Sequence, residues 1–366
     1  MTTKQKFYST KEIDKHNATY NVIFGERSNG KTFALLKKSL ENFFNGKGQF
    51  AYVRRWKEDI VGRRASELFS GINAEGVIKD ITNGQYEAIH YFAGKFYACT
   101  YASDGKAIYS DSDIVGYAFA LSNVEHDKST SYPNVTSIVF DEFLTNRLYL
   151  NDEFVIFMNV VSTIARRRTD VKIYMLGNTV NKYCPYFLEM GLSNITAQEQ
   201  GAIDIYEFGE KAALKVAVEY CSSTNTVKAK ANKYFAFDNP KLEMITGGAW
   251  ELSIYPHLPM KYRPKDILLT YFIKFSEQVF QCEVINIDDI AFTFIHAKTT
   301  PIKNPDDHII YDLEHNPKLN YSRSIYKPQR TVNKRILYFY KHDLVFFANN
   351  SIGDAVNNYL KIAAKV

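Results

Sequence analysis

The feature that most constrains this chain is the segment GERSNGKT at residues 25–32. It follows a short apolar run, YNVIF at 20–24, and precedes residues 33–44, where apolar side chains recur at helical spacing. Glycines at both of its constrained positions let backbone N–H groups approach an anion that a Cβ would keep away, and the start of a helix favours negative charge. Lys31 adds a full positive charge, and Thr32 adds a hydroxyl that can bind Mg²⁺. The segment therefore predicts a strand, a phosphate-binding loop and a helix in that order.

We expect this loop to bind the phosphates of ATP together with Mg²⁺. A glycine-rich turn without a ligand is the alternative. The candidate nucleotide-binding residues are Gly25, Glu26, Arg27, Ser28, Asn29, Gly30, Lys31 and Thr32.

Length and composition exclude several classes of protein. The chain has 366 residues, enough for two or three domains, and its 46% hydrophobic and 23% charged residues are ordinary for a folded protein. No uninterrupted apolar stretch approaches the 18 residues or so that a membrane helix needs, so no membrane partner is expected. The formal charge of +5 is too small to identify a nucleic-acid-binding protein by itself.

The first part of the chain has the pattern of an α/β domain with a mainly parallel sheet. Short apolar runs at 50–53, 136–140 and 172–176 predict buried strands, separated by helical patterns. Residues 86–120 predict a meander with glycine and aspartate turns. We expect residues 1–220 to form a P-loop ATPase domain of the additional-strand type, with a mainly parallel sheet.

Two further regions follow. Residues 221–258 are polar and then rich in glycine and proline, which predicts a small linker subdomain. Residues 259–366 begin with three strand-like runs, at 267–275, 279–287 and 290–298, and end with a helical pattern at 352–364. An antiparallel meander followed by further α/β structure would form a second domain of the α+β class.

An acidic pair follows one of the buried strands. Asp141 and Glu142 come directly after TSIVF, at the sheet edge where parallel sheets bind ligands. Asp141 is a candidate ligand of the metal, together with Thr32, and Glu142 is a candidate general base for an attacking water. A small-molecule kinase must exclude water from the γ-phosphate, so the second carboxylate favours an ATPase. A solvated acidic pair that ends a strand is the alternative.

Other polar residues could take part in hydrolysis. Asn178 follows the strand at 172–176 and could sense the γ-phosphate, although a simple turn would also place an asparagine there. Arg166, Arg167 and Arg168 precede the same strand; an arginine from a neighbouring subunit can stabilise a transferred phosphoryl group, whereas a solvated helix end is the alternative. The arginines and lysines between 54 and 64 could contact nucleotide, a neighbouring subunit or DNA, or pair with acids interleaved among them.

The basic residues also cluster near the C-terminus. Residues 315–342 contain seven lysines and arginines and no acid. Such a stretch predicts either a surface that faces a polyanion or a solvated linker.

Together, these motifs resemble a known family. GERSNGKT, YVRRW, the run VGYAFALSNVEHDKSTSYPNVTSIVFDEF and MLGNTVN are similar to the DNA-packaging (encapsidation) ATPases of phi29-type podophages, over roughly residues 20–185. The resemblance implies an ATP-driven motor that translocates double-stranded DNA into a preformed procapsid. The motor would form a homo-oligomeric ring, usually a pentamer, at the portal vertex in the host cytoplasm.

The resemblance also assigns residues and partners. Lys128 corresponds to a lysine that acts in trans between subunits, and the family's arginine finger falls near Arg166 and Arg168. Some relatives use a packaging RNA, which the acid-free stretch could contact. The second domain would be RNase H-like and without nuclease activity, because the strand at 267–275 contains no acid, although Asp288, Asp289 and Asp354 could still bind metal.

Three other functions stay open from the sequence. The chain could be a terminase-type motor with an active nuclease, a P-loop nucleotide kinase, or a binding module with an inactive loop. Cleavage of DNA, transfer of phosphate to a nucleoside, or binding of nucleotide without turnover would distinguish them.

Overall fold

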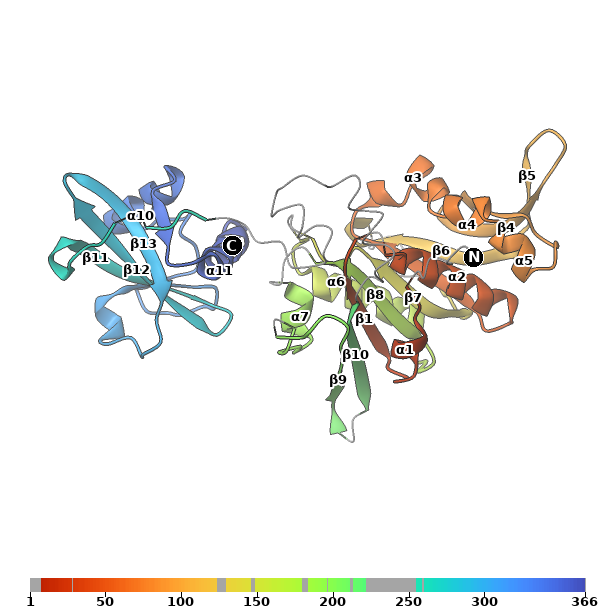
Figure 1. Ribbon diagram of the computed structural model, residues 1–366, viewed down its shortest axis with the longest axis horizontal. Coiled ribbons are helices and arrows are strands. Elements are labelled where there is room, and N and C mark those ends of the chain that lie inside the picture. The colour runs from red at the N-terminus through yellow and green to blue at the C-terminus, as the bar shows by residue number, and fades with distance from the viewer. Residues whose placement is uncertain are drawn as a thin grey trace, which may run out of the picture. The chain divides into compact units, whose positions relative to one another are not determined.

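The computed structural model describes residues 8–27, 29–123, 130–145, 149–179, 184–195, 197–210, 213–221, 255–258 and 260–365. It divides into two compact units, Met1–Glu251 and Leu252–Val366 (Figure 1). Residues 222–254, which make up most of the predicted linker subdomain, lie outside the described residues. Residues 255–258 belong to the second unit, where Tyr255 packs against Phe347.

The first unit is built on a ten-stranded sheet in the order β3-β4-β6-β2-β7-β8-β1-β10-β9, with β5 paired to β4. Its six inner strands, from β6 to β10 in that order, are parallel, and the outer pairings of β3, β4 and β9 are antiparallel. The strands are β1 (Tyr20–Gly25), β2 (Gln49–Arg54), β3 (Ala88–Phe92), β4 (Lys95–Tyr101), β5 (Ala107–Ile108), β6 (Ile114–Ala120), β7 (Val135–Asp141), β8 (Lys172–Asn178), β9 (Ile203–Phe208) and β10 (Leu214–Cys221).

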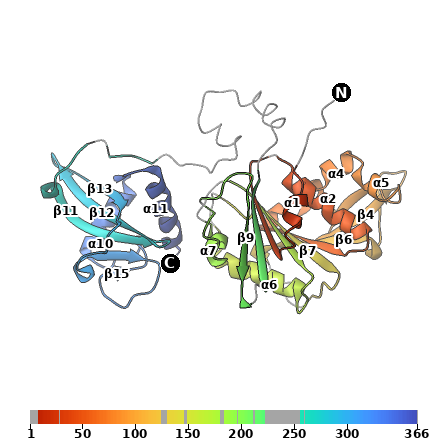
Figure 2. The same cartoon turned by 60° about the horizontal axis from the view of Figure 1, so that its bottom comes forward.

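Helices cover both faces of this sheet, and Figure 2 shows α6 and α7 on one side and α1 and α2 on the other. The helices are α1 (Lys11–Asp14), α2 (Lys31–Phe44), α3 (Gly62–Glu67), α4 (Ser70–Ala74), α5 (Val77–Ile81), α6 (Glu153–Ala165) and α7 (Pro185–Glu189). Each face has its own core: Phe157 and Tyr186 belong to one, and Leu36 and Leu40 to the other. Because both faces are covered, the central strands are buried along nearly their whole length, which accounts for their continuous apolar runs.

The strands predicted at 50–53, 136–140 and 172–176 are confirmed as β2, β7 and β8. The meander predicted at 86–120 is confirmed as well, and its last strand, β6, extends the main sheet by pairing in parallel with β2. The sequence did not reveal β10, which pairs in parallel with β1 and ends beside Gly25, where the loop at 25–32 begins.

The second unit contains a six-stranded sheet in the order β15-β14-β11-β12-β13-β16. β11, β12 and β13 form the predicted antiparallel meander, whereas β14, β15 and β16 each pair in parallel with a neighbour. The elements are β11 (Ile267–Phe275), β12 (Gln278–Ile287), β13 (Ile290–Ala297), β14 (Ile309–Asp312), β15 (Tyr321–Ser322), α10 (Thr331–Lys341), β16 (Val345–Phe347) and α11 (Asn350–Ala363).

Helices α10 and α11 pack on the sheet through buried tyrosines. The Tyr271 and Tyr340 hydroxyls lie 2.8 Å apart, and Asn333 donates to the Tyr311 hydroxyl at 2.9 Å. Tyr359 of α11 is fully buried in the same core. Hydrogen bonds within this core satisfy polar atoms that would otherwise be costly to bury.

No helix in the described part of the chain combines the length and the apolar character that a membrane crossing requires.

Candidate functional site

The carboxyl ends of four parallel strands bring the predicted site residues together. β1 ends at Gly25, β7 at Asp141 and β8 at Asn178, and β2 ends beside β7 at Arg54. Gly25 stands opposite Asn178 in the strand register. Residues that are more than 100 positions apart in sequence therefore meet at one edge of the sheet, as expected for a parallel α/β fold.

The backbone conformation of the loop requires glycine at positions 25 and 30. Gly25 has φ +149°, and a Cβ there would overlap the Cys221 carbonyl at the end of β10. Gly30 precedes α2 with φ +89°, a conformation that other residues rarely adopt. The loop therefore turns tightly between β1 and α2, with Asn29 and Lys31 buried within it.

Lys31 lies in this loop and is hydrogen-bonded to neutral groups. Its ammonium donates to the Glu26 carbonyl at 2.6 Å, to the Asn29 side chain at 3.2 Å and to the Asn178 side chain at 3.4 Å. All three acceptors are uncharged oxygens. Burial lowers the pKa of Lys31, and the nearby ionisable groups Cys221 and Asp141 oppose that effect. A buried ammonium held in this way favours the arrival of an anion.

The proposed metal ligands lie next to each other. The Thr32 hydroxyl donates to Asp141 Oδ2 at 3.0 Å, and the Tyr52 hydroxyl donates to the same oxygen at 2.7 Å. Asp141 Oδ1 accepts the backbone N–H of Glu142 at 3.0 Å. Burial, reinforced by the charge of Asp141, raises the pKa of Tyr52 well above its usual range, so its hydroxyl stays protonated and donates. The Asp141 carboxylate is thus fixed in orientation.

Glu142 differs from Asp141 in exposure. Its side chain is 57% exposed and pairs with Arg54 at 2.7 Å, while its backbone adopts φ +58°. Arg54 also lies 3.8 Å from Asp141 and 3.8 Å from Asp59. Burial acts to lower the pKa of Arg54, but Tyr52, Asp141 and Glu142 raise it overall. A cavity of about 360 Å³ adjoins this group and is lined by Tyr52, Arg54, Asp59, Ile60, Arg64, Glu67 and Leu68.

Arg166 and Arg168 lie at the opposite edge of the sheet. They follow α6 and precede β8, so they are near the amino ends of β7 and β8. Arg168 donates to the backbone carbonyls of Tyr132 and Val135, and Arg166 is exposed and donates to the Thr130 carbonyl at 2.9 Å. Neither arginine is near the glycine-rich loop of its own chain. The length of β7, with seven residues of about 3.3 Å each, separates the two edges of the sheet by roughly 20 Å.

Two predicted site residues lie outside the described residues: Ser28 of the loop and Lys128. Three acids of the second unit are candidate metal ligands by sequence. Asp288 and Asp289 form the turn between β12 and β13, and Asp354 in α11 accepts the Tyr255 hydroxyl at 2.9 Å. Within the described ranges, no group of three or more His, Cys, Asp or Glu residues is arranged to hold a metal ion.

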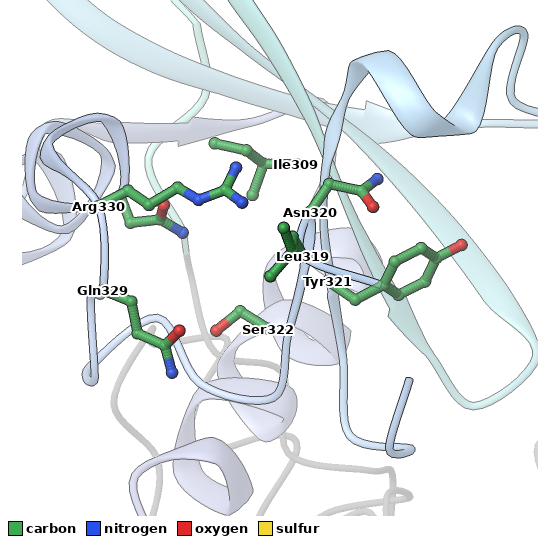
Figure 3. A pocket seen from close by; sticks show the side chains of 8 residues that line it. Ile309, Leu319, Asn320, Tyr321, Ser322, Gln329 and Arg330 are labelled. Atoms are coloured by element: carbon green, nitrogen blue, oxygen red, sulfur yellow. The ribbon is translucent and has the colours of Figure 1, made fainter. Parts of the chain in front are cut away.

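The acid-free stretch forms part of a small polar cavity in the second unit. Figure 3 shows the Arg330 guanidinium extending toward Ile309, with Gln329, Asn320 and Ser322 around it. Other cations of the stretch have local partners: Lys318 pairs with Asp306 at 2.7 Å, and Arg323 donates to the Leu313 carbonyl.

Sequence reasoning missed Tyr52 and did not single out Arg55 from the cluster of basic residues between 54 and 64. Tyr52 belongs to an apolar strand, where it donates to Asp141. Its only sequence signal is a tyrosine two residues before the end of β2, and this pattern is too common to predict that contact. Arg55 is one of several basic residues after β2, yet it is 5% exposed and forms a buried pair with Glu153. Only the packing distinguishes it from its solvated neighbours.

The fold and this edge define a mixed α/β protein with a large, mostly parallel sheet and a glycine-rich loop after its first strand. The family model for the Podovirus DNA encapsidation protein (Gp16) matches residues 2–207. Because that match spans more than half of the chain, the protein belongs to this family.

Individual relatives agree with this assignment. The DNA packaging protein of Bacillus phage phi29 is 29% identical over 192 residues, which cover 52% of this chain and 51% of the relative. That of Bacillus phage B103 is 29% identical over 175 residues, covering 47% and 48%. The chain thus spans about half the length of the curated relatives that it matches.

Two solved structures share the fold over nearly the whole chain. The bacteriophage Phi-29 viral genome packaging motor assembly matches with a TM-score of 0.57 and 20% identity, covering 98% of both chains. The Phi-28 gp11 DNA packaging motor matches with a TM-score of 0.55 and 16% identity, again over 98% of both.

Proposed function

We propose that this protein hydrolyses ATP and uses the energy to drive double-stranded DNA into a preformed procapsid. The observation that carries the proposal is the contact between Thr32 and Asp141, 3.0 Å apart, beside the buried ammonium of Lys31. The relatives named as DNA packaging proteins supply the biological context. The place of action would be the portal vertex in the host cytoplasm.

The residues at this edge fit a Mg²⁺ ion. The Thr32 hydroxyl and the Asp141 carboxylate are hard oxygen donors that already lie together, 3.0 Å apart. Thr32 and Asp141 would hold the ion. When bound, Mg²⁺ supplies positive charge that neutralises the triphosphate oxygens.

The chain's own groups would do the remaining work. The loop backbone and Lys31 bind the β- and γ-phosphates, so Lys31 exchanges its contacts with neutral oxygens for charged ones. Glu142 accepts the proton of the attacking water. Asn178 would contact the γ-phosphate, a role supported by its hydrogen bond with Lys31. Arg54 holds the Glu142 carboxylate from the side of β2.

We assign a trans-acting role to the opposite edge of the sheet. Arg166 is exposed there and donates to the Thr130 carbonyl at 2.9 Å. The other candidate, Lys128, precedes Thr130 by two residues in the chain. Arg168 is already committed to three backbone carbonyls, which favours Arg166 as the group that enters a neighbouring site. This arrangement requires a ring of subunits, with a pentamer expected from the family.

In the second unit, we propose an RNase H-like domain that binds nucleic acid without cutting it. Three antiparallel strands followed by a parallel strand beside the first, β11, support that fold. Lys274 at the end of β11 lies 3.9 Å from Asp312 at the end of β14. A lysine beside this carboxylate opposes the binding of a metal ion at these adjacent strand ends. A packaging RNA could contact the cavity around Arg330.

The alternative, a terminase-type motor with an active nuclease, makes a different prediction. Metal-dependent cutting of plasmid DNA that is lost in Asp288→Asn or Asp354→Asn would establish it. Plasmid that stays intact with Mg²⁺ or Mn²⁺ would support the motor without nuclease.

The direct test is Glu142→Gln, which keeps the size of the side chain and removes its basicity. ATP binding should stay within about twofold of the wild type, and DNA-stimulated hydrolysis should fall by about 10²–10⁴-fold. Steady-state phosphate release and the affinity for a fluorescent ATP analogue provide both measurements. Full turnover in the variant would contradict the role of Glu142, and a wild-type protein without turnover would contradict the function.

Mixed rings test the trans-acting role. Arg166→Ala subunits have an intact Glu142, and Glu142→Gln subunits have an intact Arg166, so a mixed ring contains some complete sites. Mixing two inactive proteins should restore part of the hydrolysis. If no ratio restores it although mixed rings form, Arg166 does not act between subunits.

A further inference from the structure

Arg55 is a buried and extensively hydrogen-bonded charge in the first unit, and the hydrolysis scheme above does not use it. Its side chain is 6% exposed, directly after Arg54 at the end of β2, and its partner Glu153 at the start of α6 is completely buried. The Arg55 Nε donates to both oxygens of Glu153, at 2.8 and 3.0 Å.

The rest of the guanidinium binds the segment that carries the proposed base. Nη1 donates to the Glu142 carbonyl at 3.1 Å, and Nη2 donates to the Phe143 carbonyl at 2.7 Å. The guanidinium carbon also lies 4.8 Å from the centre of the Tyr149 ring. One planar group therefore connects β2, the turn after β7 and the first turn of α6.

Glu153 is satisfied by other donors as well. The Tyr186 hydroxyl donates to Oε1 at 2.9 Å, and the backbone N–H of Leu150 donates to Oε2 at 2.7 Å. Each carboxylate oxygen thus accepts two hydrogen bonds. A buried ion pair is seldom a net source of stability compared with apolar packing, so a network this complete points to a requirement for geometry.

The backbone that Arg55 holds is unusual. Glu142 has φ +58°, in the left-handed region that non-glycine residues seldom occupy and that requires support from surrounding structure. The direction of its exposed side chain depends on this turn, and the carboxylate itself is held from the side by Arg54. Rotation of the turn would move the carboxylate without moving Asp141, which Tyr52 and Thr32 hold separately.

We infer that Arg55 is a positioning residue for hydrolysis, which orients Glu142 by binding the two carbonyls of its turn and anchoring them to Glu153. The inference rests on the proposed function, in which Glu142 is the general base. It assigns Arg55 no contact with nucleotide.

The test is Arg55→Lys in the full-length chain. Lysine keeps the charge but cannot bond Glu153 and two carbonyls with one planar fork. The kcat for ATP should fall about 10- to 100-fold, since misplacement of a reacting group by about 1 Å has effects of this size, while KM and ATP affinity stay within about twofold. Glu153→Gln, which keeps the side-chain shape, should change kcat in the same direction by a smaller factor and covers the case in which Arg55→Lys does not fold.

Measurements in the Glu142→Gln variant distinguish a positioning role of Arg55 from a general loss of folded protein. If Arg55 acts through Glu142, then Arg55→Lys should not lower the residual single-turnover rate of Glu142→Gln any further. The control is Asp14→Asn, which breaks the part-buried pair with Lys38 at 2.6 Å and should lower thermal stability without a change in kcat. All rates are compared at a temperature where every variant is folded.

Three results would overturn the inference: wild-type kcat in Arg55→Lys, an equal loss in the Glu142→Gln background, or a kcat loss in Asp14→Asn of the same size. Failure of the proposed function looks different, because Glu142→Gln itself would then retain turnover. An inactive Glu142→Gln together with a fully active Arg55→Lys would reject only the role of Arg55.

Discussion

Both sheets of this protein bring charged side chains together at the ends of neighbouring strands, but the lysines there have different partners. In the first unit, Lys31 is buried and hydrogen-bonds to three uncharged oxygens. In the second, Lys274 faces Asp312 at 3.9 Å and the Tyr321 ring at 5.5 Å. The second lysine is compensated by a carboxylate of its own unit, whereas the first is held by neutral groups.

The carboxylates of the two units differ in exposure and in their hydrogen bonds rather than in whether a cation lies near, since Arg54 is close to both Asp141 and Glu142. Asp141 shares one oxygen between two hydroxyl donors, and Glu142 is largely exposed. Glu283 in the second unit is 6% exposed and accepts hydrogen bonds from Tyr262 and Gln281, with His296 3.6 Å away. Burial tends to raise the pKa of Glu283, but His296, Tyr262 and Gln281 lower it to about 2.

The contrast between Lys31 and Lys274 indicates that the strand ends of the first unit are better suited to bind a ligand than those of the second unit. Burial lowers the pKa of Lys31 although acidic groups lie nearby, and its direct hydrogen bonds all go to neutral oxygens. Its ammonium can therefore gain charge-assisted hydrogen bonds when an anion binds. A charge that is already paired with an opposite charge of the protein stabilises the fold, and it gains less from binding a ligand. The following three predictions test that distinction.

The largest expected effect is the difference in ATP affinity between substitutions of Lys31 and of Lys274. Lys31→Met should reduce the affinity for ATP by about 100-fold or more, because charge-assisted hydrogen bonds to phosphate, each worth about 1.5–3 kcal/mol, are lost. Its melting temperature should stay the same or rise, since a desolvated charge with a lowered pKa is removed. Lys274→Met should leave ATP affinity unchanged. Calorimetry and thermal unfolding measure both. Equal losses of affinity in the two variants would remove the contrast between the sheets.

An intermediate effect is expected at Tyr52. Tyr52→Phe removes one of the two hydroxyl donors to Asp141, so kcat/KM should fall about tenfold and the concentration of Mg²⁺ for half-maximal activity should rise. The matched control is Tyr174→Phe, which removes a hydroxyl bonded to Asp14 at a distance from the phosphate loop. A Mg²⁺ dependence that is identical in the two variants would show that Tyr52 does not orient the carboxylate.

The smallest effect is expected in the second unit as a function of pH. The Glu283 carboxylate, 3.6 Å away, raises the pKa of His296, so the protonated form contributes stability below about pH 6.5 that is lost as pH rises through the raised value. Glu283, with its pKa lowered to about 2, contributes above about pH 4.5 and loses its contribution as the pH falls toward 2. The pair should therefore stabilise most between about pH 4.5 and 6.5.

The size of this effect should be about 0.5–1 kcal/mol, since His296 is partly exposed. Unfolding of the full-length protein, followed by a probe in the second unit between about pH 6 and 9, measures it. His296→Gln should flatten the dependence. An unchanged profile in that variant would assign the pH dependence to other groups.

Local patterns predicted much of the first unit. The loop at 25–32, the helix after it and the strands that end at Arg54, Asp141 and Asn178 follow from periodicity and glycine placement. β10 was not predicted, because its polar positions, Lys215 and Glu219, interrupt the apolar run. In the second unit, residues 336–348 are mostly apolar in the sequence, and in the structure they divide between the end of α10 and the strand β16.

By itself, the sequence determined that a glycine-rich loop, an acidic pair and a polar residue would each follow a buried strand. Glycine, lysine and acid at this spacing are what the proposed binding of phosphate and metal requires. The tertiary structure alone decided which side chains meet. Tyr52 reaches Asp141, Arg54 reaches Glu142, and Arg55 reaches Glu153 across separations of 88 to 98 residues. The order of strands in the sheet creates these contacts, and no local pattern encodes that order, since it results from how all the strands and helices bury their apolar faces together.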